Sequence, residues 1–329
     1  MKEYYIGIDV GGTKCAVILG KCTDGDMSIV DKIAFPTESN KGYMFAVNNI
    51  YAAIEEILKK YNLGKDEVEA MGVSCGGPLD SKTGRVLSPP NLPGWDDIPI
   101  VDMLEEKFGI ETYLQNDANA CGLAEWKFGA AKGYNNAIFC TFGTGLGAGL
   151  ILNGKLYEGT NGNAGEVGHM RISDHGPVGY GKDGSFEGFC SGGGIAQIAK
   201  TKVLERIQRG EKPSFCPDVN GLNDLNAKNV SIAADEGDEL AISIYTECAH
   251  YLGKGLSILI DVLNPEVIVL GSIYARSENL LAEECARVIA KEALPASAAV
   301  CKVVPAKLGN AIGDFAALSV AYDKNGKAV

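Results

Sequence analysis

The chain has 329 residues, 46% of them hydrophobic and 22% charged, which excludes disorder over most of its length because disordered segments are poor in apolar residues. The length favours two domains. Its 42 acidic residues against 30 basic ones give a formal net charge of −12, and such a field repels phosphate backbones, so we expect no nucleic-acid partner.

The first predicted element is a strand, a tight turn and a second strand. Apolar residues alternate through residues 4–10, a glycine turn interrupts them at 11–14, and the apolar pattern resumes at 15–19. The pattern then predicts a helix at 44–61, a strand at 70–74, an irregular proline-rich loop at 88–95, and a short strand at 113–115 that leads into a helix through Ala124.

The same strand–turn–strand pattern returns about 130 residues later, which indicates an internal duplication with one copy in each domain. The second copy is a strand at 137–142, a glycine turn at 143–147 and a strand at 148–152, followed by the hairpin turn Asn153-Gly154. The remaining predictions are an irregular glycine-rich region at 159–194, helices at 195–208, 236–263, 278–293 and 311–322, and a strand at 267–271. Strands that alternate with helices indicate an α/β fold.

The two glycine turns are candidate phosphate sites. A strand follows the second turn, whereas a dinucleotide-binding turn needs a helix there, and the chain contains no G-x-x-x-x-G-K-[ST] loop. Backbone N–H groups at a glycine bend can nevertheless converge on an anion. Asp9 can then hold Mg²⁺ through water, and Thr13 or Lys14 can reach phosphate oxygens. The alternative is that both turns are only structural hairpins.

Five motifs in chain order resemble the repressor/ORF/kinase (ROK) family of sugar kinases. They are Ile8–Lys14, Asn116–Ala120, Gly143–Gly147, Gly165–Met170 and Asn264–Gly271. The resemblance implies an actin-like (ribonuclease H-like) ATPase fold with two domains and a cleft between them. It places a smaller α/β domain at residues 1–117, completed by a C-terminal helix at about 311–325, and a larger one at 118–310.

The resemblance further implies a glucokinase-like enzyme of carbohydrate metabolism that transfers the γ-phosphoryl group of ATP, with Mg²⁺, to a hexose or amino-hexose hydroxyl. Asp117 is then the catalytic base; the alternative for it is a helix N-cap. The implied sugar-binding residues are Gly77, Asn91, Asn116, Asp117, Glu166, His169 and Glu187. The implied nucleotide-binding residues are Asp9, Gly11, Gly12, Thr13, Lys14, Thr141, Gly143, Thr144, Gly145, Gly192 and Gly271.

The chain departs from the family at a zinc site. Family members carry three cysteines that bind structural zinc together with the histidine, and this sequence has Val178, Tyr180 and Ser185 at those positions. Valine cannot ligate zinc, and a tetrahedral site needs about four ligands. We therefore expect no structural zinc, which leaves His169 in need of another group to orient it.

Two other functions stay open besides an N-acetylhexosamine or fructose kinase. One is a catalytically silent sugar-binding sensor on the same fold, and the other is an actin-like ATPase that binds no sugar. The first predicted strand begins at residue 4, so we expect neither a helix-turn-helix segment before it nor a secretory signal. No apolar run reaches about 20 residues, and the ten cysteines form no C-x-x-C pair, so we expect a cytoplasmic protein with no membrane partner. We also expect a homodimer.

Overall fold

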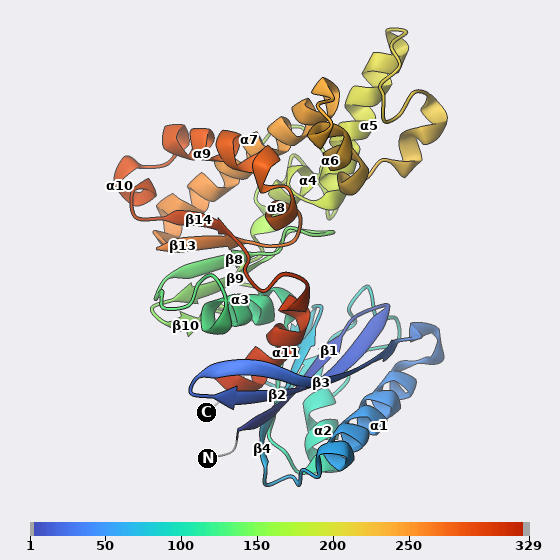
Figure 1. Ribbon diagram of the computed structural model, residues 1–329, viewed down its shortest axis with the longest axis vertical. Coiled ribbons are helices and arrows are strands. Elements are labelled where there is room, and N and C mark those ends of the chain that lie inside the picture. The colour runs from blue at the N-terminus through green and yellow to red at the C-terminus, as the bar shows by residue number, and fades with distance from the viewer. Residues whose placement is uncertain (1–2, 325–329) are drawn as a thin grey trace. The chain divides into compact units, whose positions relative to one another are not determined.

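The computed structural model describes residues 3–324, and its ribbon is shown in Figure 1. The chain forms two compact units. The first unit comprises the chain up to Asn135, Gly149–Ala164, and the chain from Lys307 on; the second comprises Asn136–Ala148 and Gly165–Ala306. Both units combine helices with β-strands, which confirms the predicted α/β class. The lobe boundary predicted at residues 117 and 118 stays a prediction, and residue 325 of the predicted C-terminal helix lies outside the described residues.

The first unit contains a five-stranded sheet with the order β3-β2-β1-β4-β7. Its strands are β1 (Tyr4–Val10), β2 (Lys14–Thr23), β3 (Asp26–Pro36), β4 (Val68–Cys75) and β7 (Thr112–Asn116). β1 pairs antiparallel with β2 and parallel with β4, and β4 pairs parallel with β7. Because β1 and β7 both end at the carboxyl edge of parallel strands, the residues at those two ends share one edge of the sheet.

Helices cover both faces of this sheet (Figure 1). Alternate residues of β1 (Ile6 and Ile8) pack in the cluster that contains α1 (Tyr43–Tyr61) and α2 (Ile100–Phe108). Tyr5 instead joins the cluster of α3 (Asp117–Phe128) and α11 (Ile312–Asp323). The period of two along β1 therefore buries this strand on both faces.

Helix α11 approaches the sheet through two glycines. A Cβ atom on Gly72 of β4 would lie 2.3 Å from the backbone nitrogen of Ala321, and one on Gly7 of β1 would lie 2.9 Å from that of Leu318. Only glycine fits at such distances from backbone atoms. The paired residues Gly7 and Gly72 of two neighbouring strands thus form a flat seat for α11 on this face of the sheet.

The second unit has three parallel strands, β8 (Ala137–Cys140), β13 (Val267–Leu270) and β14 (Lys302–Pro305), with β13 paired to both others. Its longest helices are α5 (Gly192–Gln208), α6 (Ala227–Asp235), α7 (Glu239–Leu263) and α9 (Glu278–Glu292). The short helices of this unit are α4 (Phe186–Phe189), α8 (Ile273–Arg276) and α10 (Pro295–Ala298). Its 3-10 turns are η2 (Val167–His169) and η3 (Val219–Asp224).

Short strands and turns complete the described chain. They are β5 (Leu79–Asp80), β6 (Arg85–Val86), β9 (Ala148–Leu152), β10 (Lys155–Leu156), β11 (Val178–Gly179), β12 (Lys182–Asp183), η1 (Ser39–Lys41) and η4 (Gly309–Ala311). The predicted turn Asn153-Gly154 is confirmed: it joins β9 to β10 with a φ of 53° at Asn153 and 69° at Gly154. No helix in the described residues is long and apolar enough to cross a membrane.

The predicted helix at 236–263 is wrong at its start. Helix α7 begins at Glu239, capped by the side chain of Asp238, and Gly237 has a φ of 92°, which ends the preceding turn. A separate helix, α6, lies before it and was not predicted. The predicted strand at 137–142 also ends early, at Cys140, because Thr141 hydrogen-bonds within the glycine turn. The sequence prediction also missed β3 and α2.

Candidate functional site

The glycine turn of the first unit is held from outside by two hydroxyl groups. Within the turn, the N–H of Gly11 donates to the carbonyl of Lys14 at 3.1 Å. Thr37 donates to the carbonyl of Gly11 at 2.6 Å, and Ser39 donates to that of Gly12 at 3.0 Å. With these carbonyls paired, the bend is fixed between β1 and β2.

This turn lies against the predicted sugar-binding loop. A Cβ atom on Gly12 would lie 2.5 Å from the carbonyl oxygen of Asn91. The loop is anchored by Trp95, which is fully buried in the core beneath it. The structure therefore brings together two motifs, the first turn and Asn91, that are separated by about eighty residues in the sequence, and only glycine permits their contact.

Asp9 is a desolvated carboxylate next to this turn. Burial, and then the nearby charge of Asp314, raises the pKa of Asp9 to about 6, while Lys14 and Lys32 act in the opposite direction. Lys32 is engaged by Asp314, whose two oxygens accept its hydrogen bonds at 2.5 and 2.7 Å. Within the described chain, the carboxylate of Asp9 accepts no hydrogen bond. Its lone pairs are therefore available to a water-bound cation or another external donor.

Asn116 and Asp117 stand at the junction of β7 and α3. Asn116 is the N-cap of α3: its side chain accepts from the N–H of Ala118 at 3.0 Å, so the capping role proposed as the alternative for Asp117 belongs to Asn116. Oδ1 of Asp117 accepts from the same N–H at 2.7 Å. Oδ2 lies beside Gly76, whose added Cβ would be 4.0 Å away. Gly77 lies next to Asn116, with 3.1 Å from an added Cβ to Nδ2.

Asp117 is exposed to solvent, yet many protein atoms lie around its carboxyl group. This desolvation raises its pKa above the ordinary value, and the hydrogen bond from Ala118 only partly offsets the effect. A carboxylate that is poorly solvated and has a free oxygen is a better proton acceptor than a fully hydrated one. The group is therefore suited to general-base chemistry.

A buried polar network that the sequence analysis missed orients these residues. Gln115 accepts from the N–H of Asn116 at 2.8 Å and from the side chain of Asn119 at 3.1 Å. Its own amide donates to Glu158 at 3.0 Å, and Glu158 also accepts from Ser81 at 2.7 Å. A glutamine inside a buried apolar strand is the signal that was available, since buried amides need partners.

The glycine turn of the second unit is held differently. The hydroxyl of Thr141 accepts from the N–H of Gly147 at 2.8 Å. Glu187 accepts from the N–H of Leu146 at 2.9 Å, and the carbonyl of Gly143 accepts from the N–H of Gly192 at 2.8 Å. The side chains of Thr141 and Glu187 thus each accept a hydrogen bond from the turn itself. Their predicted contacts with nucleotide and sugar stay predictions.

The predicted sugar-binding residues of the second unit gather around this turn. Glu166 precedes η2 and His169 ends it, and both are exposed. Between them, Gly168 permits close packing, because an added Cβ would lie 2.2 Å from the carbonyl oxygen of Leu146. Motifs that are separate in the sequence, the turn, η2 and Glu187 of α4, therefore form one surface within this unit.

The three positions where zinc cysteines are missing have other roles. Val178 and Tyr180 are exposed on the hairpin of β11 and β12, and Ser185 caps α4 by accepting from the N–H of Gly188 at 3.0 Å. The described residues contain no group of three or more His, Cys, Asp or Glu side chains placed to hold a metal ion. The expectation of a zinc-free protein stays a prediction.

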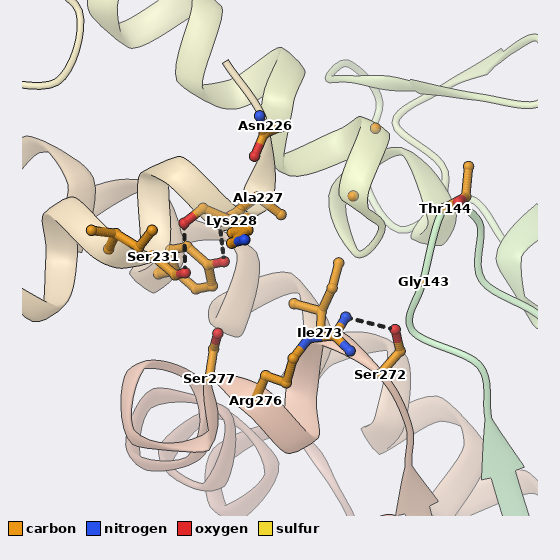
Figure 2. A pocket seen from close by; sticks show the side chains of 14 residues that line it. Gly143, Thr144, Asn226, Ala227, Lys228, Ser231, Ser272, Ile273, Arg276 and Ser277 are labelled. Atoms are coloured by element: carbon orange, nitrogen blue, oxygen red, sulfur yellow. Dashed lines mark hydrogen bonds between the residues drawn. The ribbon is translucent and has the colours of Figure 1, made fainter. Parts of the chain in front are cut away.

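A cavity of about 760 Å³ opens beside the second turn (Figure 2). Three predicted nucleotide-binding residues line it: Gly143, Thr144 and Gly192. Gly271 lies just before the lining residue Ser272 and donates its N–H to the carbonyl of Cys140 at 3.0 Å. The other lining residues are Gly193, Asn226, Ala227, Lys228, Ser231, Ile232, Tyr245, Ser272, Ile273, Arg276 and Ser277.

The cavity combines apolar and cationic walls. Isoleucines provide its apolar surface, Lys228 and Arg276 provide positive charge, and α5 begins at Gly192 with the positive end of its dipole. Arg276 donates to the hydroxyl of Ser272 at 3.0 Å, as Figure 2 shows. Such a site suits a ligand with a flat apolar part and an anionic tail.

The sequence profile of the ROK family matches residues 5–324. The chain belongs to the ROK family. A glucokinase from Halalkalibacterium halodurans is 34% identical to this ROK protein over 313 residues, which cover 94% of this chain and 92% of the glucokinase. A xylose repressor from Bacillus spizizenii is 29% identical over 307 residues, covering 93% of this chain and 73% of the repressor.

Among solved structures, a ROK family glucokinase from Streptomyces griseus, in complex with glucose and AMPPNP, is similar to this ROK protein with a TM-score of 0.74. It is 28% identical, and the match covers 97% of this chain and 99% of that one. The likeness confirms the predicted actin-like fold class. Glucokinases and repressors both occur among the relatives, so membership of the ROK family alone does not separate an enzyme from a regulator.

Proposed function

We propose that this protein is an ATP-dependent hexose kinase that transfers the γ-phosphoryl group to a sugar hydroxyl, as a glucokinase does. The observation that carries the proposal is the state of Asp117. Surrounding protein raises the pKa of its carboxyl group although the residue is exposed to solvent, its Oδ1 accepts from the N–H of Ala118, and it follows directly on Asn116, which offers both a donor and an acceptor to a polyol. The similarity to a glucokinase over nearly the whole chain supports the same conclusion.

The residues of the chain divide the chemistry between them. Asp117 takes the proton of the attacking sugar hydroxyl. The hydroxyl oxygen bonds to the γ-phosphorus as ADP leaves, and Asn116 and Asn91 orient the sugar. The remaining sugar contacts are assigned to Gly77, Glu166, His169 and Glu187. The phosphates are assigned to the two glycine turns, and the nucleoside to the cavity between Lys228 and Arg276.

Asp9 is the residue suited to hold Mg²⁺ through water, because its carboxylate is negative, desolvated and without a protein donor in the described chain. When bound, Mg²⁺ neutralises charge on the β- and γ-phosphate oxygens. We assign Thr13 and Lys14, both exposed at the first turn, to the same phosphates.

A coupled ADP-release assay over a panel of hexoses, including N-acetylmannosamine, N-acetylglucosamine, mannose and fructose, tests the proposal. With the best sugar, Asp117→Asn is expected to lower kcat by a factor of about 10² to 10⁴ while calorimetry still detects sugar binding, because the substitution removes the proton acceptor but keeps the shape. Asp24→Asn is the matched control, since Asp24 lies in the exposed turn between β2 and β3 at a φ of 53° that asparagine tolerates. Retention of turnover within a few-fold by Asp117→Asn would remove Asp117 from the role of base.

A second candidate is a sugar sensor without catalysis. The similarity to a xylose repressor and the loss of the zinc cysteines favour it. The sensor predicts tight hexose binding by calorimetry with no ADP release from any sugar of the panel. The kinase proposal predicts that hexose binding is accompanied by ADP release.

A further inference from the structure

The hairpin of β11 and β12 carries a conformational outlier. Tyr180 and Gly181 form its two-residue turn, between the pairs Val178↔Asp183 and Gly179↔Lys182, with φ values of 46° and 75°. Positive φ at both central residues is typical of type I′ turns, where asparagine and glycine are preferred. A tyrosine pays a steric cost for that backbone. Its side chain recovers little of this by burial, because it is 78% exposed.

The tyrosine ring is directed at the predicted sugar ligand His169. The two rings meet edge to face, with centroids 5.3 Å apart and planes at 84°. Neither ring nitrogen of His169 forms a hydrogen bond within the described residues, so both are open to a ligand. Among the ring contacts of the described residues, His169 therefore meets Tyr180 edge to face.

Several hydrogen bonds tie this hairpin to its surroundings. The side chain of Gln197 in α5 pairs with both backbone groups of Val178, accepting at 2.9 Å and donating at 2.8 Å. Lys182 donates to the carbonyl of His169 at 2.7 Å, and Arg171 donates to the carbonyl of Asp183 at 2.8 Å. The backbone of His169 is thus tied to the same hairpin that carries the tyrosine. A strained residue persists only where its surroundings determine it, as they do here.

We propose that Tyr180 is a positioning residue: its ring holds the imidazole of His169 in the orientation that binds the sugar, in place of a metal ion. The proposal rests on the proposed function for the role of His169. It assigns a purpose to an exposed aromatic residue on an unfavourable backbone, at a position where the sequence has lost a cysteine.

Tyr180→Gly tests this, because glycine relieves the backbone and removes the ring. We expect the sugar KM to rise by about 3- to 10-fold, the value of one aromatic contact. The ATP KM and kcat are expected to change less than about twofold, and Tm to stay equal or rise. Tyr180→Phe keeps the ring and should restore the sugar KM. Val178→Ala is the matched control, since it shortens another side chain of the same hairpin, 48% exposed, without removing a ring.

A double-variant cycle shows whether Tyr180 acts through the histidine. In a His169→Asn background, Tyr180→Gly should add no further rise in sugar KM. An equal penalty in both backgrounds, or an unchanged KM in the single variant, would overturn the proposal.

NMR provides a readout that does not depend on turnover. The chain has only three histidines, and the ring current of Tyr180 should displace the imidazole proton signals of His169. Tyr180→Gly should abolish that displacement and leave His250, which meets the ring of Tyr251 at 5.4 Å, unchanged. If no hexose supports ADP release, the kinase proposal fails, but calorimetric sugar affinity of the same variants still decides the role of Tyr180: an affinity unchanged by Tyr180→Gly refutes it.

Discussion

The two glycine turns occupy corresponding places in their strand–turn–strand segments, yet their supporting residues behave in opposite ways. Asp9 stands two residues before Gly11, and Thr141 stands two residues before Gly143. The Thr141 hydroxyl is used inside its own turn, accepting from Gly147 at 2.8 Å. The Asp9 carboxylate accepts no hydrogen bond within the described residues, and burial raises its pKa to about 6.

This difference indicates a division of labour between the turns. A satisfied hydroxyl stabilises the native fold, whereas a desolvated carboxylate without a donor destabilises it and is retained for what it binds. The surroundings follow the same division. The first turn is crowded by backbone at Gly12, while the nearest atom to an added Cβ on Gly143 is the hydroxyl oxygen of Ser272, at 3.6 Å.

Substituting one glycine in each turn should give the largest difference in stability and turnover between the two turns. In Gly12→Ala the new methyl would lie 2.5 Å from the carbonyl oxygen of Asn91, so backbone must move. We expect a loss of about 2–4 kcal/mol in the free energy of unfolding and turnover reduced by more than about tenfold. Gly143→Ala, the same change in the open turn, should leave Tm nearly unchanged and raise only the ATP KM. Chemical denaturation measures the stability of both variants, and ADP release measures their turnover. Equal stability losses would contradict the expected difference in crowding between the two turns.

Removing the hydroxyl of the second turn should have a moderate effect. Thr141→Val keeps the shape but leaves the N–H of Gly147 without its acceptor, which should cost about 1–2 kcal/mol of stability. Thr141→Ser, which retains the oxygen, should recover most of this loss. A Thr141→Val protein as stable as the parent would show that the hydroxyl is kept for a ligand and not for the turn.

Neutralising Asp9 should change stability in the opposite direction and by the smallest amount. Its folded pKa of about 6 exceeds the ordinary 3.8, so the native state binds the proton more tightly and the parent protein loses stability as pH rises from 4 through 6. Asp9→Asn does not titrate; it should therefore be about 1 kcal/mol more stable than the parent above pH 6, a value reduced for solvent screening, with no difference below pH 4. Thermal unfolding against pH measures this. A stabilisation that grows as pH falls would contradict it.

The sequence predicted the features whose signals are local. The bends at Gly11 and Gly143 interrupt apolar runs, and Asn153-Gly154 is a strong hairpin signal, so these elements were placed correctly. Helices α1 and α9 follow from their apolar spacing. The prediction placed Gly237 in the first turn of a helix that begins at residue 236, whereas its left-handed backbone marks the break between α6 and α7.

Features made by distant segments could not be predicted. The cavity wall joins Lys228 of α6 to Arg276 of α8, and neither lies in a recognisable motif. The pairing of Gln115 with Glu158 also depends on the tertiary fold. The sequence led to the expectation that His169 needs another group to orient it, but the contact of its ring with Tyr180 depends on the turn geometry of one hairpin.

The seat of α11 on Gly7 and Gly72 has a consequence for biosynthesis. Strand β1 leaves the ribosome before the second unit does, but the helix that covers its second face is encoded after the whole second unit. Until that helix emerges, the sheet that bears Asp9 exposes an apolar, glycine-lined surface to solvent. Synthesis of the second unit thus proceeds while the first is unfinished, and chaperones that recognise exposed apolar sheets have their longest opportunity during that interval.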